Sequence, residues 1–430
     1  MEHRDQKSAE EQPGGRKASR SRATRSFRLH IGLLGRRNVG KSSLINALMG
    51  QDVAIVSDTP GTTTDPVTKP MELQPIGPVL LIDTAGLDDS GDLGTRRIER
   101  TRAMLDRCDI VLLVVGAGAW SSTEEALLAD LKQMETPVIV VCNQADRQTA
   151  DSDLLDTLTR DGVPVVHTVA PEKQGLAELR QAIIAATPGD FLEPTAMVSD
   201  LVGPGELAVL VVPIDMEAPR GRLIMPQVQA IRDLLDGDAM CMVVKERELG
   251  PALANLKQPP KLVVTDSQAF LKVAADTPPE VALTSFSILM ARFRGDLSLQ
   301  VVGAAAIDRL QAGDRVLIAE ACSHHPLAED IGRVKLPQWL TRYLGGALQI
   351  EHAQGHDFPA DLADFKLVIH CGACTMNRRE VLSRLQRCRD AGVPVTNYGL
   401  AIAFSLGIFD RALVPFPAAR DAYLQLRETP

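Results

Sequence analysis

One group of residues that could do chemistry forms a phosphate-binding loop. Gly35-Arg36-Arg37-Asn38-Val39-Gly40-Lys41-Ser42 follows an apolar run at residues 29–34 and precedes a segment of helical periodicity at residues 43–49. This is the strand, loop and helix order of a P-loop, in which backbone N–H groups surround phosphates at a helix N-terminus. Lys41 would offset the charge of the β- and γ-phosphates, and Ser42 would bind magnesium. The predicted phosphate-binding residues are Gly35, Asn38, Val39, Gly40, Lys41, Ser42 and Ser43.

Two further motifs indicate magnesium and guanine. Asp83-Thr84-Ala85-Gly86 follows a predicted strand at residues 79–82, where Asp83 could hold magnesium through water and the Gly86 N–H could face the γ-phosphate. Asn143-Gln144-Ala145-Asp146 follows another predicted strand, and a carboxylate at Asp146 could accept two N–H bonds that guanine offers and adenine does not. The predicted guanine-binding residues are Asn143, Gln144, Asp146 and, through their backbone, Val169 and Ala170.

A second group of reactive residues combines cysteine with histidine. Cys322-Ser323-His324 follows a predicted strand at residues 314–319, and His370-Cys371-Gly372-Ala373-Cys374 lies at the end of another at residues 365–370. Because the carboxyl ends of parallel strands face one crevice, the two clusters can converge. Four ligands, Cys322, His324, Cys371 and Cys374, would suit structural zinc, whereas three thiolates with a weaker fourth ligand would suit an iron–sulfur cluster. A redox pair, or buried thiols with unrelated histidines, is also compatible with this pattern.

The elements that must position these motifs predict an α/β chain with three domains. At 430 residues the chain exceeds what one core usually organises. Strands alternate with helices throughout, and three short strands at residues 207–214, 239–244 and 261–264 predict a small βαβ unit with a structural or dimerising role. We therefore expect a disordered arm at 1–26, a P-loop GTPase domain at 27–190, a dimerisation domain at 200–275 and a domain carrying the cysteine clusters at 276–430.

Composition narrows the class of protein. The net charge is −9 and 3% of residues are aromatic, which argues against a large nucleic-acid platform because such platforms need positive charge and stacking rings. No apolar run is long enough to span a membrane, and the start has no apolar signal segment. The odd number of cysteines, 7, fits free thiols in a reducing compartment. We expect a cytoplasmic protein that does not bind membranes.

The first part of the chain resembles the bacterial TrmE-Era-EngA-like GTPases. The resemblance rests on the three motifs in order and on Pro60-Gly61-Thr62-Thr63-Thr64-Asp65, and it implies that Thr63 is a magnesium ligand and that Asn38 holds a potassium ion. The chain has Gln144 where these proteins usually have Lys, and Leu87 where Ras-like proteins have a water-orienting Gln. We therefore predict a slow, potassium-stimulated GTPase. Its catalytic residues are predicted to be Lys41, Thr63, Asp83 and Gly86.

The whole chain after the arm resembles the HydF family of FeFe-hydrogenase maturation GTPases. This resemblance rests on the two cysteine clusters, their spacing and the segment CSHHPLAEDIGRVKLPQWL at residues 322–340. It implies a 4Fe–4S cluster on Cys322, Cys371 and Cys374 with an exchangeable fourth site, and His324 and His370 match the histidines of the motif. It further implies a homodimeric scaffold that receives a diiron precursor made by the radical-SAM maturases HydE and HydG and passes it to apo-hydrogenase. The alternative is a potassium-activated GTPase of RNA modification or ribosome assembly with a structural zinc site.

Overall fold

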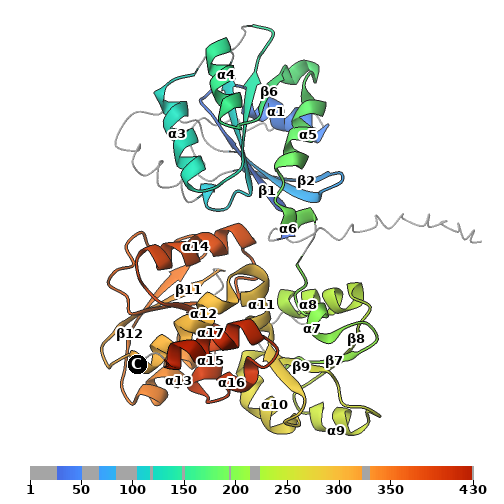
Figure 1. The fold of residues 1–430 in the computed structure, drawn as a ribbon, viewed down its shortest axis with the longest axis vertical. Coiled ribbons are helices and arrows are strands. Elements are labelled where there is room, and N and C mark those ends of the chain that lie inside the picture. Colours follow the sequence, from blue (N-terminus) through green and yellow to red (C-terminus); the bar gives the residue numbers. More distant parts are fainter. Residues whose placement is uncertain are drawn as a thin grey trace, which may run out of the picture.

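The described part of the chain forms three parallel or mostly parallel sheets, each accompanied by helices (Figure 1). The computed structural model describes residues 27–50, 67–83, 104–116, 120–147, 151–192, 195–213, 223–321 and 330–428. The predicted arm at 1–26 lies outside these ranges. Strands and helices alternate along the described chain, which confirms the predicted α/β class.

The first sheet has six strands in the order β2-β3-β1-β4-β5-β6, and β2 alone of the six runs antiparallel to its neighbour. Its inner strands are apolar on both faces because helices cover both, and two separate hydrophobic clusters fill the two sides. The elements are β1 (Leu29–Leu34), α1 (Lys41–Met49), β2 (Val67–Leu73), β3 (Gly77–Asp83), β4 (Ile110–Gly116), α3 (Ser122–Gln133), β5 (Val138–Asn143), α4 (Ser152–Arg160), β6 (Val165–Thr168), η2 (Ala170–Glu172) and α5 (Leu176–Ala186).

The second sheet has four parallel strands in the order β10-β9-β7-β8. Its elements are α6 (Gly189–Leu192), α7 (Ser199–Val202), β7 (Leu207–Val211), α8 (Met225–Asp236), β8 (Met240–Val244), α9 (Leu249–Ala254), β9 (Leu262–Thr265), η3 (Ser267–Ala269), α10 (Phe270–Asp276) and β10 (Ala282–Ser285). The three expected strands are β7, β8 and β9. The fourth strand, β10, lies beyond residue 275, where the sequence suggested a boundary. Its four residues, ALTS, are too few and too polar for their pattern to predict a strand.

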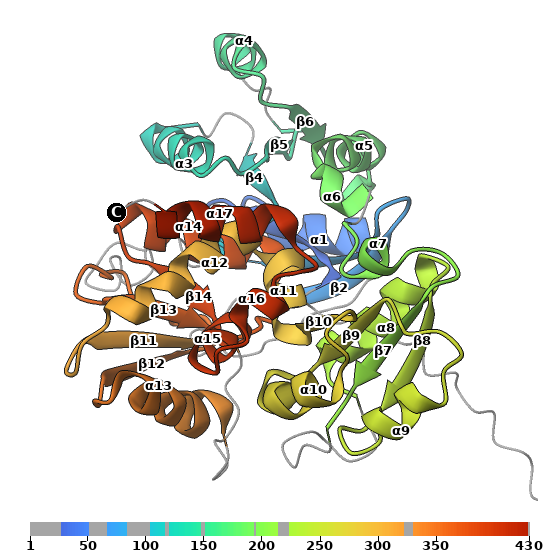
Figure 2. The same cartoon turned by 60° about the horizontal axis from the view of Figure 1, so that its bottom comes forward.

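The third sheet also has four parallel strands, in the order β12-β11-β13-β14. Helix α13 packs on one side and α14 on the other (Figure 2). The elements are α11 (Phe286–Arg294), α12 (Leu297–Ala304), η4 (Ala305–Arg309), β11 (Arg315–Glu320), the π-helical turn η5 (Ile331–Lys335), α13 (Leu336–Leu344), β12 (Gln349–Gln354), β13 (Leu367–His370), α14 (Arg378–Asp390), β14 (Val395–Asn397), α15 (Tyr398–Ser405), α16 (Phe409–Ala412) and α17 (Pro417–Glu428).

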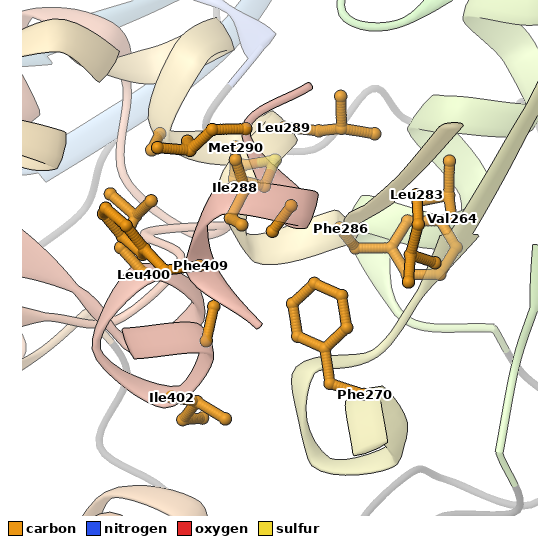
Figure 3. Close-up of a cluster of buried hydrophobic side chains, with 14 of the residues drawn as sticks. Val264, Phe270, Leu283, Phe286, Ile288, Leu289, Met290, Leu400, Ile402 and Phe409 are labelled. Atoms are coloured by element: carbon orange, nitrogen blue, oxygen red, sulfur yellow. The ribbon is translucent and has the colours of Figure 1, made fainter. Parts of the chain in front are cut away.

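One hydrophobic core joins the second and third sheets (Figure 3). It includes Val264 and Leu283 from the second sheet, Leu400 and Ile402 from α15, and Phe286 at the start of the connecting helix α11. Burying each such side chain contributes about 1.5–3 kcal/mol, so this shared core fixes the two sheets against each other. Within the described ranges, no helix combines the length and apolarity needed to cross a membrane.

Candidate functional site

The P-loop connects β1 to α1 and is held in a conformation that only certain residues tolerate. Gly35, Asn38 and Gly40 have φ values of 152°, 65° and 89°. A Cβ atom on Gly35 would lie 2.2 Å from the Val114 carbonyl oxygen, so the strand end requires glycine. The buried Lys41 ammonium donates to the carbonyl oxygens of Gly35 at 2.7 Å and Arg36 at 2.8 Å, which places it across the loop. The loop is therefore held by its glycines and by Lys41, and phosphate binding by it stays a prediction.

A carboxylate with one oxygen lacking a partner faces the start of α1. Ser42 Oγ donates to Asp83 Oδ2 at 3.2 Å, while Oδ1 is buried and has no hydrogen-bond partner among the described residues. Burial raises the pKa of Asp83, against the opposing effects of Lys41, the Ser42 hydroxyl and Lys69. A buried carboxylate oxygen beside a serine hydroxyl fits a divalent cation, because oxygen ligands are those that Mg²⁺ prefers. Ser42 and Asp83 thus fit the predicted magnesium site.

Asn143 ties the guanine motif to the P-loop. Its Nδ2 donates to the Val39 carbonyl oxygen at 2.9 Å, and its Oδ1 accepts from Thr168 Oγ1 at 3.0 Å and the Ala170 N–H at 3.3 Å. Asn143 therefore acts here by positioning loops rather than by presenting free polar atoms to a base. The loop containing Val169 and Ala170, whose backbone is predicted to bind guanine, is held in place by this contact.

Gln144 and Asp146 are the remaining described polar residues of the guanine motif. Gln144 has φ 60°, and its Nε2 donates to the Asn38 carbonyl oxygen at 3.2 Å. Asp146 is exposed, as binding to a base requires, and so is Ser43. Two of the predicted catalytic residues, Thr63 and Gly86, lie outside the described residues.

The CxxC loop begins where β13 ends. The Cys371 N–H donates to the Ala319 carbonyl oxygen at 2.9 Å, so the ladder between β11 and β13 continues to the first cysteine. Cys371 Sγ accepts from the N–H groups of Ala321 at 3.0 Å and Ala373 at 3.4 Å. The loop turns at Ala373, whose φ is 51°. Two N–H···S contacts favour a thiolate over a thiol, because both direct positive partial charge at the sulfur.

Cys374 is the second cysteine of the loop, and the guanidinium of Arg294 acts on its charge. Burial raises the pKa of the Cys374 thiol, and the positive charge of Arg294 opposes that rise. Arg294 is itself buried and lies over the Phe27 ring at 4.2 Å from its centroid. Cys371 and Cys374 are both free thiols rather than a disulfide.

The residue that precedes the segment containing Cys322 and His324 contacts this loop. Both residues lie outside the described residues. Ala321, which immediately precedes Cys322, donates to Cys371 Sγ and accepts from Thr375 Oγ1 at 3.1 Å. The chain is described again at the buried Asp330. Within the described ranges, no three His, Cys, Asp or Glu side chains form a group able to hold a metal ion.

His370 is buried behind the cysteine loop. Its Nδ1 lies 3.0 Å from the Cys371 carbonyl oxygen, and its Nε2 lies 3.3 Å from an Arg384 guanidinium nitrogen. Burial, followed by the Arg384 charge, lowers the pKa of His370 to about 4. The neutral ring therefore donates from Nδ1 and accepts at Nε2. Both nitrogens are engaged by the protein in this arrangement, so iron ligation by His370 would require one contact to break.

The charged residues that support this loop could not be recognised from the sequence. Arg384 and Glu380, on α14, are 4% and 5% exposed and pair at 3.2 Å, and His356 Nδ1 approaches Glu380 at 2.8 Å. In a helix that reads RREVLSRLQRCRD, such residues look like a solvated face. Only the sheet packed beneath them distinguishes the buried charges from the exposed ones.

Three known protein families match successive parts of the chain. Residues 30–144 match the family described as 50S ribosome-binding GTPase, residues 197–295 match the hydrogen maturase F dimerization domain, and residues 298–415 match the hydrogen maturase F tetramerization domain. The dimerization match extends past residue 275 and includes β10, in agreement with the second sheet.

Curated relatives match the first part of the chain. The tRNA modification GTPase MnmE of Synechococcus sp. (strain JA-3-3Ab) is 39% identical over 155 residues, which are 36% of this chain and 32% of the relative. GTPase Der of Rhizobium johnstonii is 36% identical over 168 residues, which are 38% of this chain and 35% of the relative. The chain thus spans about a third of the length of these relatives.

Solved structures match the same region. The G domain of the T. maritima FeoB iron transporter is 28% identical with a TM-score of 0.30, and the match covers 37% of this chain and 98% of that one. The prediction of a GTPase is confirmed by the GTPase family match and the GTPase relatives. The chain has a GTPase domain followed by the dimerization and tetramerization domains of hydrogen maturase F, and it therefore belongs to the hydrogen maturase F family.

Proposed function

We propose that this protein is a scaffold and carrier in FeFe-hydrogenase maturation. It holds a 4Fe–4S cluster through Cys322, Cys371 and Cys374, receives a diiron precursor and transfers it to apo-hydrogenase, with GTP hydrolysis as a regulatory switch. One observation carries this proposal. Cys371 Sγ accepts an N–H bond from Ala321, so the residue that immediately precedes the first cysteine motif in the chain contacts the second motif at the ends of β11 and β13.

The surroundings of the two described cysteines suit such a cluster. Backbone N–H groups approach Cys371 Sγ, and the positive charge of Arg294 opposes the rise in the pKa of Cys374 that burial causes. Hydrogen bonds to sulfur and nearby charge are the means by which proteins stabilise iron–sulfur clusters. The bound cluster would supply an iron with one exchangeable position. The chain supplies the thiolates, the N–H donors and the low-dielectric wall at His370, while His324 stays a candidate for the fourth position.

GTP hydrolysis is assigned to the edge of the first sheet. Lys41 and Ser42 would hold the phosphates and magnesium together with Asp83, and we assign Thr63 and Gly86 to the γ-phosphate side. Asn38 is proposed to hold a potassium ion, which would supply the transition-state charge that other GTPases obtain from an arginine. Because Leu87 cannot orient water, we expect slow turnover. Hydrolysis can then change partner affinity by at most the difference in binding energy between nucleotide states.

The second sheet supports assembly into a homodimer. β8 is an edge strand of that sheet, and Met240 and Val243 on it are 54% and 44% exposed. Val228 and Leu235 on the neighbouring α8 are also exposed. An exposed apolar edge is a site of strand pairing or association, and the dimerization-domain match points to a second copy of this chain as the occupant. The proposed further partners are HydE, HydG and apo-hydrogenase, in the cytoplasm.

A different function is favoured by the curated relatives alone. MnmE is named as a tRNA modification GTPase. Under this alternative the chain would be a potassium-activated GTPase acting on RNA, and its cysteines would hold zinc. The net charge of −9 and the 3% aromatic content weigh against RNA binding.

Metal content separates the two functions. The full chain is reconstituted anaerobically with iron and sulfide in the presence of zinc, and bound metal and the EPR spectrum of the reduced protein are measured. We expect about four irons and a reduced 4Fe–4S signal in the parent, and loss of both in Cys371→Ala. Cys388→Ala is the matched control, because Cys388 is a buried thiol on α14 outside the motifs. Tightly bound zinc with no iron signal would overturn the proposal.

A further inference from the structure

The helix that follows the CxxC loop lies against the GTPase domain (Figure 1). Asn377 Nδ2 donates to the Arg107 carbonyl oxygen at 2.9 Å and lies 3.3 Å from an Asp109 carboxylate oxygen. The Arg379 guanidinium donates to Thr136 Oγ1 at 2.8 Å and to the backbone carbonyl of Met134. These contacts link residues more than two hundred positions apart in the chain. They join the third sheet directly to the first.

Further contacts continue along one side of α14. Ser383 Oγ donates to Asp106 Oδ1 at 2.8 Å, and Arg107 Nε lies 3.8 Å from Glu380 Oε2. Asn377, Glu380 and Ser383 are three residues apart and so project on one side of the helix. Residues 106–109 are therefore held by α14 at several points. We call this contact, between Asn377, Arg379, Glu380 and Ser383 on one side and residues 106–109, 134 and 136 on the other, the α14 joint.

On the GTPase side, the joint reaches the strand that carries the P-loop. Asp109 Oδ2 accepts the His30 N–H at 2.8 Å, and His30 Nδ1 lies 3.1 Å from the same Arg107 carbonyl oxygen that Asn377 binds. His30 belongs to β1, whose last residue immediately precedes Gly35. In sequence, residues 106–109 also follow the Asp83-to-Gly86 motif and precede β4. The joint thus contacts β1, which leads to the P-loop, and it includes residues 106–109, which follow the Asp83-to-Gly86 motif in the chain.

On the cysteine side, the joint begins three residues after Cys374. Asn377 Oδ1 accepts the Glu380 N–H at 3.2 Å and so caps the N-terminus of α14. One amide group therefore holds the helix start with its oxygen and the GTPase domain with its nitrogen. Asn377 is 1% exposed, so water cannot readily replace either bond. A shift of residues 107–109 must either break a buried bond or move the end of the cysteine loop.

Charge interactions also link the cysteine loop, the α14 joint and the GTPase domain. Burial lowers the pKa of the Arg294 guanidinium to about 10, and the charges of Cys374 and Asp109 oppose this effect. The ring contact of Arg294 with Phe27 places it at the residue where the described GTPase domain begins. Arg294 thus interacts with charges on both the cysteine loop and the joint.

We propose that the α14 joint, through Asn377, transmits the nucleotide state of the GTPase domain to the Cys371–Cys374 loop. What the loop holds rests on the proposed function, whereas the transmission itself concerns the protein alone. Couplings of this kind are typically worth a factor of about 5–150 in an equilibrium constant. By linkage, the same factor must appear at both ends, so a change in the cysteine loop changes the relative affinities for GTP and GDP.

Hydrogen exchange in the full chain tests the joint. Backbone exchange of residues 371–376 is measured with saturating GDP and with saturating non-hydrolysable GTP analogue. In the parent we expect the exchange rates to differ between the two states by at least about fivefold. Asn377→Ser keeps a good helix cap but is too short to reach the Arg107 carbonyl, so we expect the difference to vanish.

Asn397 provides a matched control within the same domain. It caps α15 through the Leu400 N–H at 3.0 Å, and its Nδ2 donates at 2.7 Å to the Ser287 carbonyl oxygen, away from the GTPase domain. We expect Asn397→Ser to keep the nucleotide-dependent difference. Asp109→Asn keeps an oxygen for the His30 N–H but turns an amide towards Asn377, so it should abolish the difference from the GTPase side if Asn377→Ser does not fold.

Three results would overturn the proposal: equal exchange in both nucleotide states of the parent, a difference that survives in whichever joint variant folds, or its loss in Asn397→Ser. The measurement needs no metal. Failure of the chain to bind iron would therefore contradict the proposed scaffold function without affecting the joint, and a failed joint would leave the iron test unchanged.

Discussion

The nucleotide edge of the first sheet and the cysteine edge of the third sheet share one plan but differ in burial. In each sheet a strand has neighbours on both sides that come later in the chain: β1 lies between β3 and β4, and β11 lies between β12 and β13. Loops at such reversals leave a crevice at the carboxyl ends of the strands. The P-loop and the cysteine motifs both follow strands at these positions.

Their surroundings suit different ligands. At the nucleotide edge, Asn38, Ser42 and Asp146 are exposed, and the loop conformation is kept by left-handed backbone and by Asn143. At the cysteine edge, His370 and Arg384 are buried, and N–H groups approach the thiol from two directions. An open, pre-shaped loop suits a ligand that exchanges in each cycle. A loop of partly buried cysteines backed by buried charges suits a group that stays until it is transferred.

The strongest disruption is expected at the nucleotide edge. Gly40→Ala would place a Cβ 2.3 Å from Asn143 Nδ2 at a φ of 89°, so the P-loop and the guanine motif would separate. We expect GTP affinity, measured by calorimetry, to fall by about 100-fold, equivalent to roughly 3 kcal/mol. Gly50→Ala is the matched control: it ends the same helix at φ 66° with nothing within 4 Å, so affinity should be unchanged. Equal losses in both variants would contradict a specifically shaped loop.

At the cysteine edge, the expected effect of a substitution is a loss of folding stability. Burial alone would raise the pKa of Glu380, but the His356 hydrogen bond and the charges of Arg384 and Arg107 hold it below its ordinary value. Glu380→Gln leaves these cations without a carboxylate, and we expect the free energy of unfolding in urea at pH 7 to fall by about 3 kcal/mol. A carboxyl group whose pKa is lower in the folded state than in the unfolded state stabilises the fold at pH values above its unfolded-state pKa. This contribution is lost as the pH falls and Glu380 becomes protonated, so the difference in stability between the parent and the variant should shrink below about pH 4.

The exposed Glu248→Gln serves as the control for this loss, since its partner Lys245 is half exposed. It should leave the free energy of unfolding close to that of the parent, because solvent screens this exposed pair. A similar small change in Glu380→Gln would mean that the buried charges at the cysteine edge do not support it.

Potassium should affect the nucleotide edge alone. We expect GTP turnover to be roughly tenfold faster in potassium than in sodium at equal ionic strength, because the ion supplies transition-state charge that Leu87 cannot help to organise. Asn38→Ala should remove the difference, measured as phosphate release. Turnover that is the same in the two salts would contradict the potassium site.

The smallest expected effect comes from Gln144→Lys. Gln144 already reaches the Asn38 carbonyl oxygen, and a lysine stem would add apolar cover for a base. We expect GDP to bind about threefold tighter, which corresponds to roughly 0.6 kcal/mol. Gln386→Lys adds the same charge at an exposed position of α14 and should leave GDP affinity unchanged. Weaker binding in Gln144→Lys would show that the base is held in another way.

How much the sequence could predict differed between the two edges. The P-loop strand and helix, the strand before Asp83 and the parallel order follow from apolar runs and glycine positions, which are local signals. The role of Asn143 as a tie, the shared core around Phe286 and the burial of Arg384 depend on segments far apart in the chain. No local pattern encodes such contacts. β10 was missed because its four residues are too few to show a period.

Transfer of metal to its acceptor tests the proposed scaffold most directly. The anaerobically reconstituted chain, loaded with a synthetic diiron precursor and freed of unbound iron, is mixed with apo FeFe-hydrogenase, and hydrogen evolution is followed. We predict activation by the loaded parent and by Cys388→Ala, and none by Cys371→Ala treated in the same way. Equal activation by Cys371→Ala, or no activation by a parent that retains its iron, would contradict the carrier role.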